Sequence, residues 1–144
     1  MKTRFPGIVC LILALVLSIA AARYNLSEPA AFIRQNEVAL SALAGEVMLN
    51  SGSGAFNCPG AEQVAAMIYV KDGTNYIPYV EFFRVTDHGF SGFYFSPTDI
   101  PIPFQGLDEI KLDSTIYGWE WEYQGYYGNT TKIIDCWYAF NAYL

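Results

Sequence analysis

The pattern of apolar and polar residues divides the chain into a helical part and a part with the two-residue period of β-strands. Over residues 28–49, apolar side chains recur at steps of three and four, as on one face of an amphipathic helix. Ser27 is a suitable N-cap, and the glycine-containing segment 50–54 is expected to end the helix. The predicted buried face consists of Phe32, Ile33, Asn36, Ala39, Leu40, Leu43 and Val47.

From residue 64 onward the period becomes that of strands. Segments 64–71 and 76–85 form a predicted hairpin around a turn at 72–75, and a third strand follows at 90–96. Segments 116–123 and 131–140 form a second predicted hairpin around residues 125–129. Prolines cannot donate hydrogen bonds to a sheet, so the segment 97–106, which contains three of them, is an expected extended connector. The sequence thus predicts an α+β fold, with one N-terminal amphipathic helix packed on an antiparallel sheet of about five strands.

The first 22 residues have the organisation of a secretory signal peptide. Lys2 and Arg4 precede an apolar run at 8–19, and the small residues Ala20 and Ala22 suit a signal peptidase. The run is shorter than the roughly 20 residues of a membrane-spanning helix. We therefore expect cleavage before Arg23, a single domain over 23–144 without stable membrane insertion, and an extracellular location, or a periplasmic one if the source is bacterial.

Charge and composition limit the partners of this domain. Without Lys2 and Arg4, 8 − 2 = 6 basic residues face 14 acidic ones, a formal charge of 6 − 14 = −8. Nucleic acid and anionic lipid are therefore poor partners. Without Phe5 of the leader, 10 − 1 = 9 Phe remain, and with the eleven Tyr and three Trp they favour an ordered, aromatic-rich core. The sequence leaves the oligomeric state open.

Two cysteines, Cys58 and Cys136, remain after the leader, which contains Cys10, is removed. In an oxidising compartment the expected outcome is one disulfide between them. The alternative is two buried thiols.

Segment 116–123 carries the clearest candidate binding pattern. Tyr117, Trp119, Trp121 and Tyr123 share one strand face, and Glu120 and Glu122 share the other. Such a face either forms a platform on which sugar rings stack or packs into the core, and the half-buried strand is the favoured interpretation.

Catalytic and metal sites have weaker support. Glu120 and Glu122 project in parallel from one strand, whereas a glycosidase pair flanks its substrate from opposite sides. His88, the single histidine, lies in a predicted turn without a suitably spaced serine and carboxylate. Its spacing to Asp87 and Asp99 fits no zinc or calcium pattern, so neither a metal nor a cofactor is expected.

Two sequons, at Asn25 and Asn129, are candidate glycosylation sites in a eukaryotic source. Asn129 is the stronger candidate because its predicted position is an exposed hairpin loop.

These features favour a small, secreted, acidic binding or interaction protein whose ligand is a protein or a glycan. Exposed aromatics and rigid prolines bind at low entropic cost, so the loop at 126–127 and the connector at 97–104 are the expected contact segments. The candidate contact residues are Phe104, Trp119, Trp121, Tyr126 and Tyr127. A small secreted hydrolase based on Glu120, Glu122 or His88 is an alternative.

Two family resemblances provide further hypotheses. The basic leader, Gly7, apolar stretch, helix and antiparallel sheet together resemble the layout of type IV pilins. This resemblance implies a surface-assembly subunit that begins at Ile8 and retains its apolar helix, although Ile12 stands where pilins usually carry a glutamate. The helix over an antiparallel sheet is also similar to cystatin-like folds, and residues 63–67 resemble their inhibitory loop, with Met67 in place of its final glycine.

Overall fold

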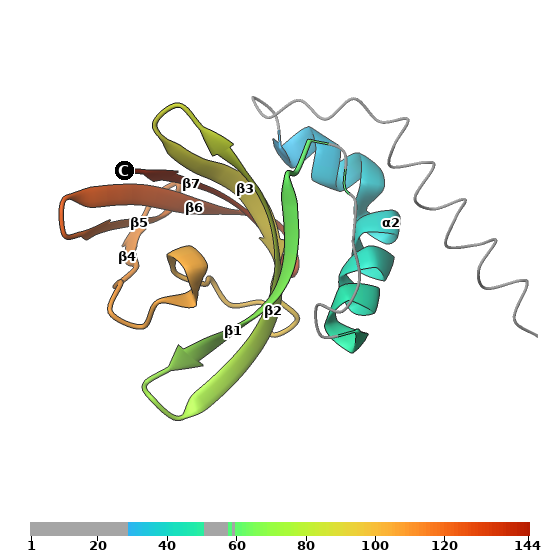
Figure 1. Ribbon diagram of the computed structural model, residues 1–144, viewed down its shortest axis with the longest axis horizontal. Helices are drawn as coiled ribbons and strands as arrows, with labels where there is room; N and C mark the ends of the chain where they lie inside the picture. Colours follow the sequence, from blue (N-terminus) through green and yellow to red (C-terminus); the bar gives the residue numbers. More distant parts are fainter. Residues whose placement is uncertain (1–28, 51–57, 59) are drawn as a thin grey trace, which may run out of the picture.

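The computed structural model describes residues 29–50, 58 and 60–144, which form one α-helix, seven strands and a short 3-10 helix (Figure 1). The expected signal peptide, the Ser27 cap and the Asn25 sequon lie outside the described residues. The elements are α2 (Pro29–Leu49), β1 (Gln63–Lys71), β2 (Asn75–Thr86), β3 (Gly89–Phe95), η1 (Phe104–Gly106), β4 (Asp113–Thr115), β5 (Gly118–Tyr123), β6 (Tyr126–Ile134) and β7 (Trp137–Tyr143).

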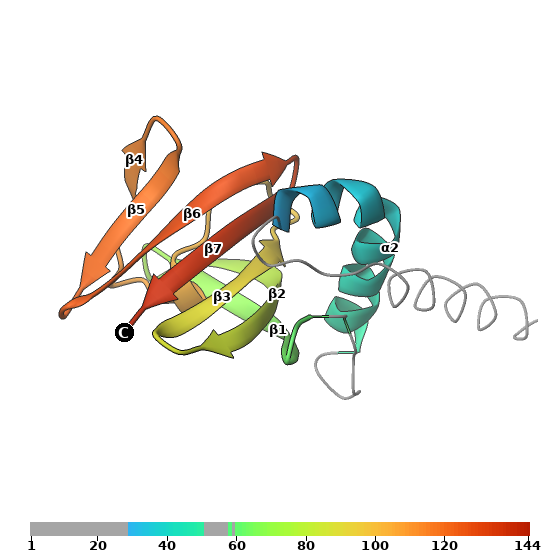
Figure 2. The same cartoon turned by 90° about the horizontal axis from the view of Figure 1, so that it is seen from above.

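All seven strands belong to one antiparallel sheet with the order β1-β2-β3-β7-β6-β5-β4. The sheet is strongly curved, with α2 against its convex side and η1 on its concave side (Figure 1). Seen from above, β4 and β5 extend beyond the end that α2 covers (Figure 2). The two sides of the sheet therefore have different coverings.

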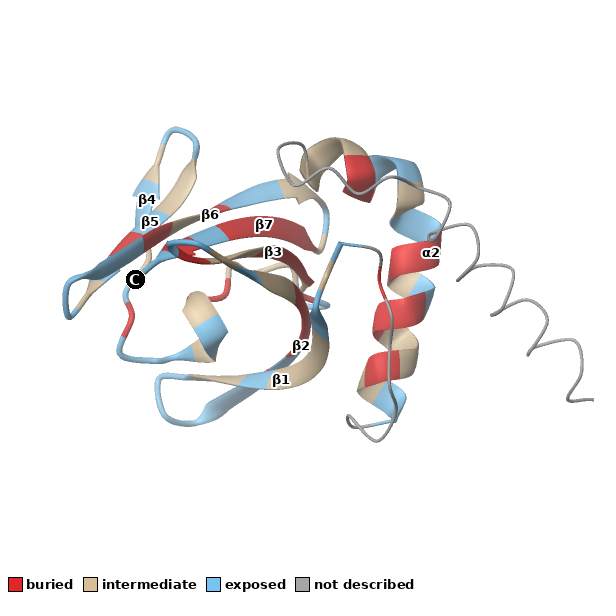
Figure 3. Ribbon diagram, turned by 45° about the horizontal axis from the view of Figure 1, so that its top comes forward, coloured by how far each residue is buried: buried red, intermediate tan, exposed pale blue. Residues whose placement is uncertain are grey.

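Helix α2 confirms the amphipathic pattern. All of the predicted apolar stripe is buried, together with Ala44, and this face is turned toward the sheet (Figure 3). Asn36 is the exception, because its backbone leaves the helical conformation (φ −119°, ψ 15°) and its side-chain amide donates to the Phe32 carbonyl at 2.9 Å. A side chain that bonds within its own turn competes with the helix ladder, which accounts for the interruption.

The central strands β2, β3 and β7 are buried on both faces. Toward α2 they present Val80, Phe82, Phe93 and Trp137, and the Phe82 and Phe93 rings stack with centroids 4.8 Å apart. Toward the concave side they present a second aromatic layer made of Tyr79, Tyr94, Tyr138 and Phe140. Such strands need a cover on both sides, because apolar surface left in water costs about 25 cal/mol per Å².

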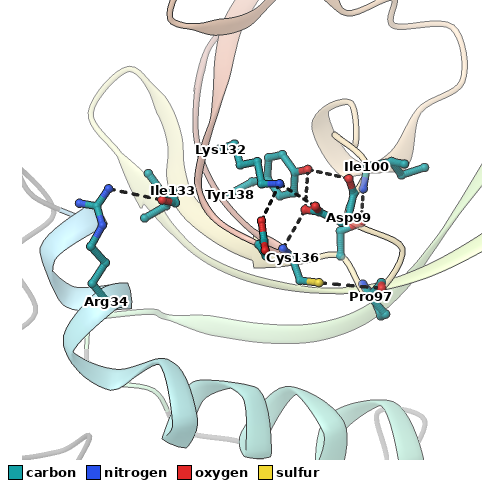
Figure 4. Close-up of polar contacts among 10 residues, drawn as sticks. Arg34, Pro97, Asp99, Ile100, Lys132, Ile133, Cys136 and Tyr138 are labelled. Atoms are coloured by element: carbon teal, nitrogen blue, oxygen red, sulfur yellow. Dashed lines mark hydrogen bonds and ion pairs between the residues drawn. The ribbon is translucent and has the colours of Figure 1, made fainter.

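The concave cover is the proline-rich segment 97–112, which we call the strap. Asp99 fixes its start: Oδ2 lies 2.6 Å from Lys132 Nζ, and Oδ1 accepts the Cys136 N–H at 2.8 Å (Figure 4). The Tyr138 hydroxyl donates to the Asp99 carbonyl at 3.0 Å. Farther on, the Phe104 ring stacks on Trp121 at 5.5 Å. The expected connector is thus an internal cover, in which Ile102 and Pro103 are buried and Phe104 packs against the core.

The sheet has seven strands, so the prediction of about five is wrong. The predicted strand 131–140 is two strands, β6 and β7, separated by a turn at Asp135 and Cys136, where Cys136 has a positive φ of 67°. The turn between β5 and β6 contains two residues, Gln124 and Gly125, both with positive φ, so β6 begins at Tyr126. The three-residue strand β4 at the sheet edge was also missed.

The predicted disulfide is wrong as well. No disulfide joins Cys58 and Cys136, the two cysteines of the described residues. Cys58 is buried in the core between α2 and the sheet, whereas the Sγ of Cys136 faces the Pro97 carbonyl at 3.9 Å, at the start of the strap. A count of cysteines cannot establish that their Cβ atoms approach closely enough to be bridged.

The two thiols should differ in reactivity. Burial raises the pKa of Cys58 to about 12, whereas Cys136 lies in a partly exposed turn and its pKa is raised by burial and by the nearby carboxylates of Asp99 and Asp135. We expect iodoacetamide to label Cys136 slowly in the native protein and Cys58 only after unfolding, because the thiolate is the reactive form. Peptide mass mapping with a Cys136→Ser control measures both rates. Protection of both cysteines in denaturant without reductant would contradict the thiol assignment.

Trp121 and Tyr117 provide a matched test of the predicted aromatic face. Trp121 is 5% exposed, whereas Tyr117 lies in the β4–β5 turn and is 81% exposed. We expect Trp121→Ala to lower the free energy of unfolding by about 3–5 kcal/mol. Tyr117→Ala should change it by less than about 0.5 kcal/mol. Urea denaturation measures both, and equal losses would contradict the inward assignment of Trp121.

Candidate functional site

Strand register places a polar row across the convex face beyond α2. Directly paired residues share a face of a sheet, and the pairing links one residue on each of six strands. In spatial order these are Arg84, Ser91, Asn141, Asn129, Glu120 and Asp113. The Asn141 amide donates to Asn129 Oδ1 at 3.4 Å. A neighbouring row on the same face pairs Glu122, Tyr127 and Tyr143.

The uncovered end of these rows forms an open hollow of about 510 Å³. We call it the acidic hollow. It is lined by Asp113, Glu120, Trp121, Glu122, Tyr127, Gly128, Asn129 and Tyr143. Its size falls within the range of small-ligand sites, although its open shape suits an extended segment better than an enclosed molecule.

Three exposed carboxylates, of Asp113, Glu120 and Glu122, line this hollow without a cationic partner in the described part of the chain. The ion pairs found among the described residues join Lys132 to Asp99 and to Asp135. Like charges on one surface repel one another, so the acidic hollow is a region of negative potential that attracts cations.

A pair of tyrosines lies beside these carboxylates. The rings of Tyr127 and Tyr143 stack with centroids 5.0 Å apart and an interplanar angle of 21°, and both side chains are exposed. Beneath them, Gly128 leaves room for the Trp121 indole, since a Cβ at residue 128 would lie 2.6 Å from that ring. Aromatic faces and carboxylates together can bind a guanidinium or ammonium group.

The structure separates the predicted contact residues. Tyr127 lines the acidic hollow, and Tyr126 is exposed at the start of β6. Phe104, Trp119 and Trp121 belong to the concave core and contact the strap or its neighbours. Within the aromatic face, Trp121 is buried, Trp119 and Tyr123 are half-buried, and Tyr117 is exposed. Glu120 and Glu122 are both exposed on the opposite face, as the alternation predicts.

Asn129 and His88 occupy simpler positions. Asn129 lies half-buried within β6 and not at a hairpin tip, so the reason for preferring this sequon is removed. His88 is exposed in the β2–β3 turn, where its carbonyl accepts the Leu144 N–H at 3.0 Å. Three strand spacings, roughly 14 Å, separate the end of β3 next to His88 from Glu122 on β5. The structure therefore does not assemble His88, Glu120 and Glu122 into a catalytic group.

Among the described residues, no cluster of three metal-ligating side chains is arranged to hold an ion.

One buried carboxyl group, that of Glu81 on β2, was not among the predicted site residues. It is 3% exposed on the concave face, and its Oε1 has no hydrogen-bond partner among the residues that the structure describes. Burial raises the pKa of its carboxyl to about 7, and a hydrogen bond with Tyr79 opposes this rise. The signal was present in the sequence, because a two-residue period places Glu81 on the same face as Ile77 and Tyr79.

Comparisons with known proteins leave the site to be interpreted from its own chemistry. No protein-family model matches the chain, and neither a curated protein nor a solved structure is significantly similar to it. Within the described residues, no helix combines the length and apolar character needed to cross a bilayer.

Glu81 should make the stability of the protein depend on pH. Its folded-state pKa of about 7 lies above the ordinary value of 4.5, so its contribution is greatest below about pH 4.5 and is lost as the pH rises through 7. The loss amounts to about 3 kcal/mol. Glu81→Gln keeps the shape and removes the charge, so we expect it to flatten this dependence and to stabilise the protein at pH 8. Urea titrations from pH 4 to 8 measure the effect. Glu37→Gln, on the exposed face of α2, is the control, and an unchanged profile in Glu81→Gln would contradict the assignment.

Proposed function

We propose that the protein is an extracellular binding module that receives a lysine- or arginine-rich segment of a partner protein in the acidic hollow. One observation carries the proposal: two stacked tyrosines and three carboxylates that pair with no cation among the described residues line a single open hollow. The leader-like first 22 residues support the extracellular location.

A basic segment fits this surface better than a neutral glycan does. The carboxylates of Asp113 and Glu120 stand directly opposite each other on β4 and β5, and Glu122 follows two residues later on the same face. A cation relieves the repulsion among these groups, whereas a neutral sugar leaves it in place. Guanidinium groups also bind carboxylates in a bidentate manner and stack on tyrosine rings.

The overall negative charge of the chain also favours a basic partner. The formal net charge is −6 for the full sequence, so a basic partner is attracted over long range as well as at the contact. This attraction accelerates encounter, and salt weakens it. The acidic hollow would thus bind the basic segment, and the net negative charge of the whole molecule would attract the partner during diffusion.

The proposal predicts that three substitutions abolish most of the binding of a hexa-arginine peptide. We expect the combination of Asp113→Asn, Glu120→Gln and Glu122→Gln to weaken binding about tenfold or more, since each exposed pair contributes about 0.2–1 kcal/mol. Isothermal titration calorimetry measures the affinity. The wild-type affinity should also fall between about 50 and 200 mM salt.

A control with the same change in net charge separates local binding from general attraction. Glu37→Gln, Asp108→Asn and Glu109→Gln neutralise three exposed carboxylates outside the acidic hollow, and this combination should retain most of the affinity. Equal losses in both triple variants would contradict a local site. Salt-independent binding of a neutral oligosaccharide that requires Tyr127 would favour a glycan and overturn the proposal.

A further inference from the structure

A small cavity lies on the other face of the sheet, between the concave core and the strap. Its free volume of about 10 Å³ accommodates the centre of one water-sized group. The polar side chains that line it are Glu81, Tyr94 and Thr130, and its aromatic lining comes from Phe104, Trp121 and Phe140. Ile102 and Pro103 of the strap complete the enclosure.

The hydroxyl groups of Tyr94 and Thr130 already donate their protons to other acceptors. Thr130 Oγ1 donates to the Ala139 carbonyl at 3.1 Å, so the Tyr94 hydroxyl is the donor in its 3.2 Å contact with Thr130. Tyr94 Oη in turn accepts the Ile102 N–H at 2.9 Å. Neither hydroxyl has a proton left for the carboxylate of Glu81.

Tyr79 satisfies the carboxyl of Glu81 only in part. Its single proton lies within reach of Met67 Sδ, at 3.4 Å, and it also bonds the Glu81 carboxyl. Within the described part of the chain, Oε1 of Glu81 remains without a hydrogen-bond partner. A buried acceptor without a donor is unfavourable, so the cavity is short of hydrogen-bond donors and of positive charge.

We propose that this cavity is a binding site for the protonated amino group of a small amine, held by Glu81. An ammonium group has only donors, matches the size of the cavity and carries the charge that ionised Glu81 lacks. The aromatic rings of the lining provide additional attraction through their π faces. The site is distinct from the acidic hollow, because Glu81 faces the concave side of the sheet, although Trp121 lines both.

Burial of a charged pair is usually costly, because both ions lose water. Here folding has already removed water from Glu81, so only the incoming amine adds a new cost. A proton competes with the amine for the Glu81 carboxylate, because protonation removes its negative charge. At pH 5, with a pKa of about 7, only about 1% of Glu81 is ionised, so the apparent affinity for an amine falls about a hundredfold relative to pH 8.

The other ionisable groups around the site do not titrate in this range. Tyr79 on β2, Tyr94 on β3 and Tyr138 on β7 face the same core, and burial raises the pKa of each phenol further above its usual value. Trp121 on β5, Thr130 on β6 and the strap residues 102–104 carry no charge. On β1 the residue paired with Glu81 is Ala65. The pH dependence of amine binding therefore reports Glu81.

The test compares ammonium chloride, methylammonium chloride and sodium chloride at equal concentration, using the full chain. We expect ammonium to raise the melting temperature above the sodium chloride value at pH 8, with saturation, and to have no specific effect at pH 5. Methylammonium should have a smaller effect, because its methyl group exceeds the space for one water-sized group. Tetramethylammonium, which lacks N–H donors and exceeds the cavity, should behave as sodium does. Glu81→Gln should abolish the specific effect, and Glu37→Gln should preserve it.

A second measurement does not depend on a variant. The carbon-13 resonance of the Glu81 side-chain carboxyl follows its ionisation, and saturating ammonium should lower the pH midpoint by one unit or more because the cation stabilises the carboxylate. An unchanged midpoint means that water alone occupies the cavity, and this outcome overturns the proposal. Equal stabilisation by sodium or by tetramethylammonium, or stabilisation that persists in Glu81→Gln, overturns it as well. None of these results depends on binding of a basic peptide to the acidic hollow.

Discussion

Burial of both faces of the central strands is the constraint on which the rest of the structure depends. β2, β3 and β7 carry large apolar side chains on alternate residues in both directions, so the sheet requires a cover on each side. The helix α2 supplies one cover and the strap supplies the other. Because the strap has only the short helix η1 and is not paired with the sheet ladder, polar anchors hold it, and Asp99 is the principal one. Hydrogen bonds from Lys132, Cys136 and Tyr138 keep the pKa of Asp99 below its usual value.

The same constraint separates two kinds of surface. The helix covers only one end of the convex face, and the residues beyond it are polar because they remain in water. The strap covers the concave face more completely and encloses Glu81. Trp121 contributes to both environments, since it lines the cavity and also the base of the acidic hollow. A ligand that displaced this indole on one face would therefore alter the packing on the other.

Elements that depend on interactions between residues close in sequence, such as α2 and the β1–β2 hairpin, were predicted from the sequence. The stripe of α2 is an i, i+3, i+4 pattern, and the hairpin of β1 and β2 is closed by Asp72 and Gly73, both with positive φ. The break at Asp135 and Cys136 was not predicted, because Asp135 is a single turn-forming residue without an adjacent glycine, proline or asparagine, and apolar residues flank both sides. The inward position of the strap, the register of the acidic hollow and the separation of the two cysteines depend on contacts between distant segments. Glu81 is intermediate, because its face follows from the alternation but its lack of a donor follows only from packing.

The position of β7 has a consequence for how the chain folds. Residues 137–143 lie between β3 and β6 and supply the ladder hydrogen bonds that join β1–β3 to β4–β6. A chain that emerges from its N-terminus, from a ribosome or through a translocation channel, therefore presents two partial sheets with unpaired edges until β7 arrives. Such edges pair readily with other chains. Assembly of the domain is consequently a late, nonlocal event, and the interval before insertion of β7 is the period of greatest exposure to aggregation.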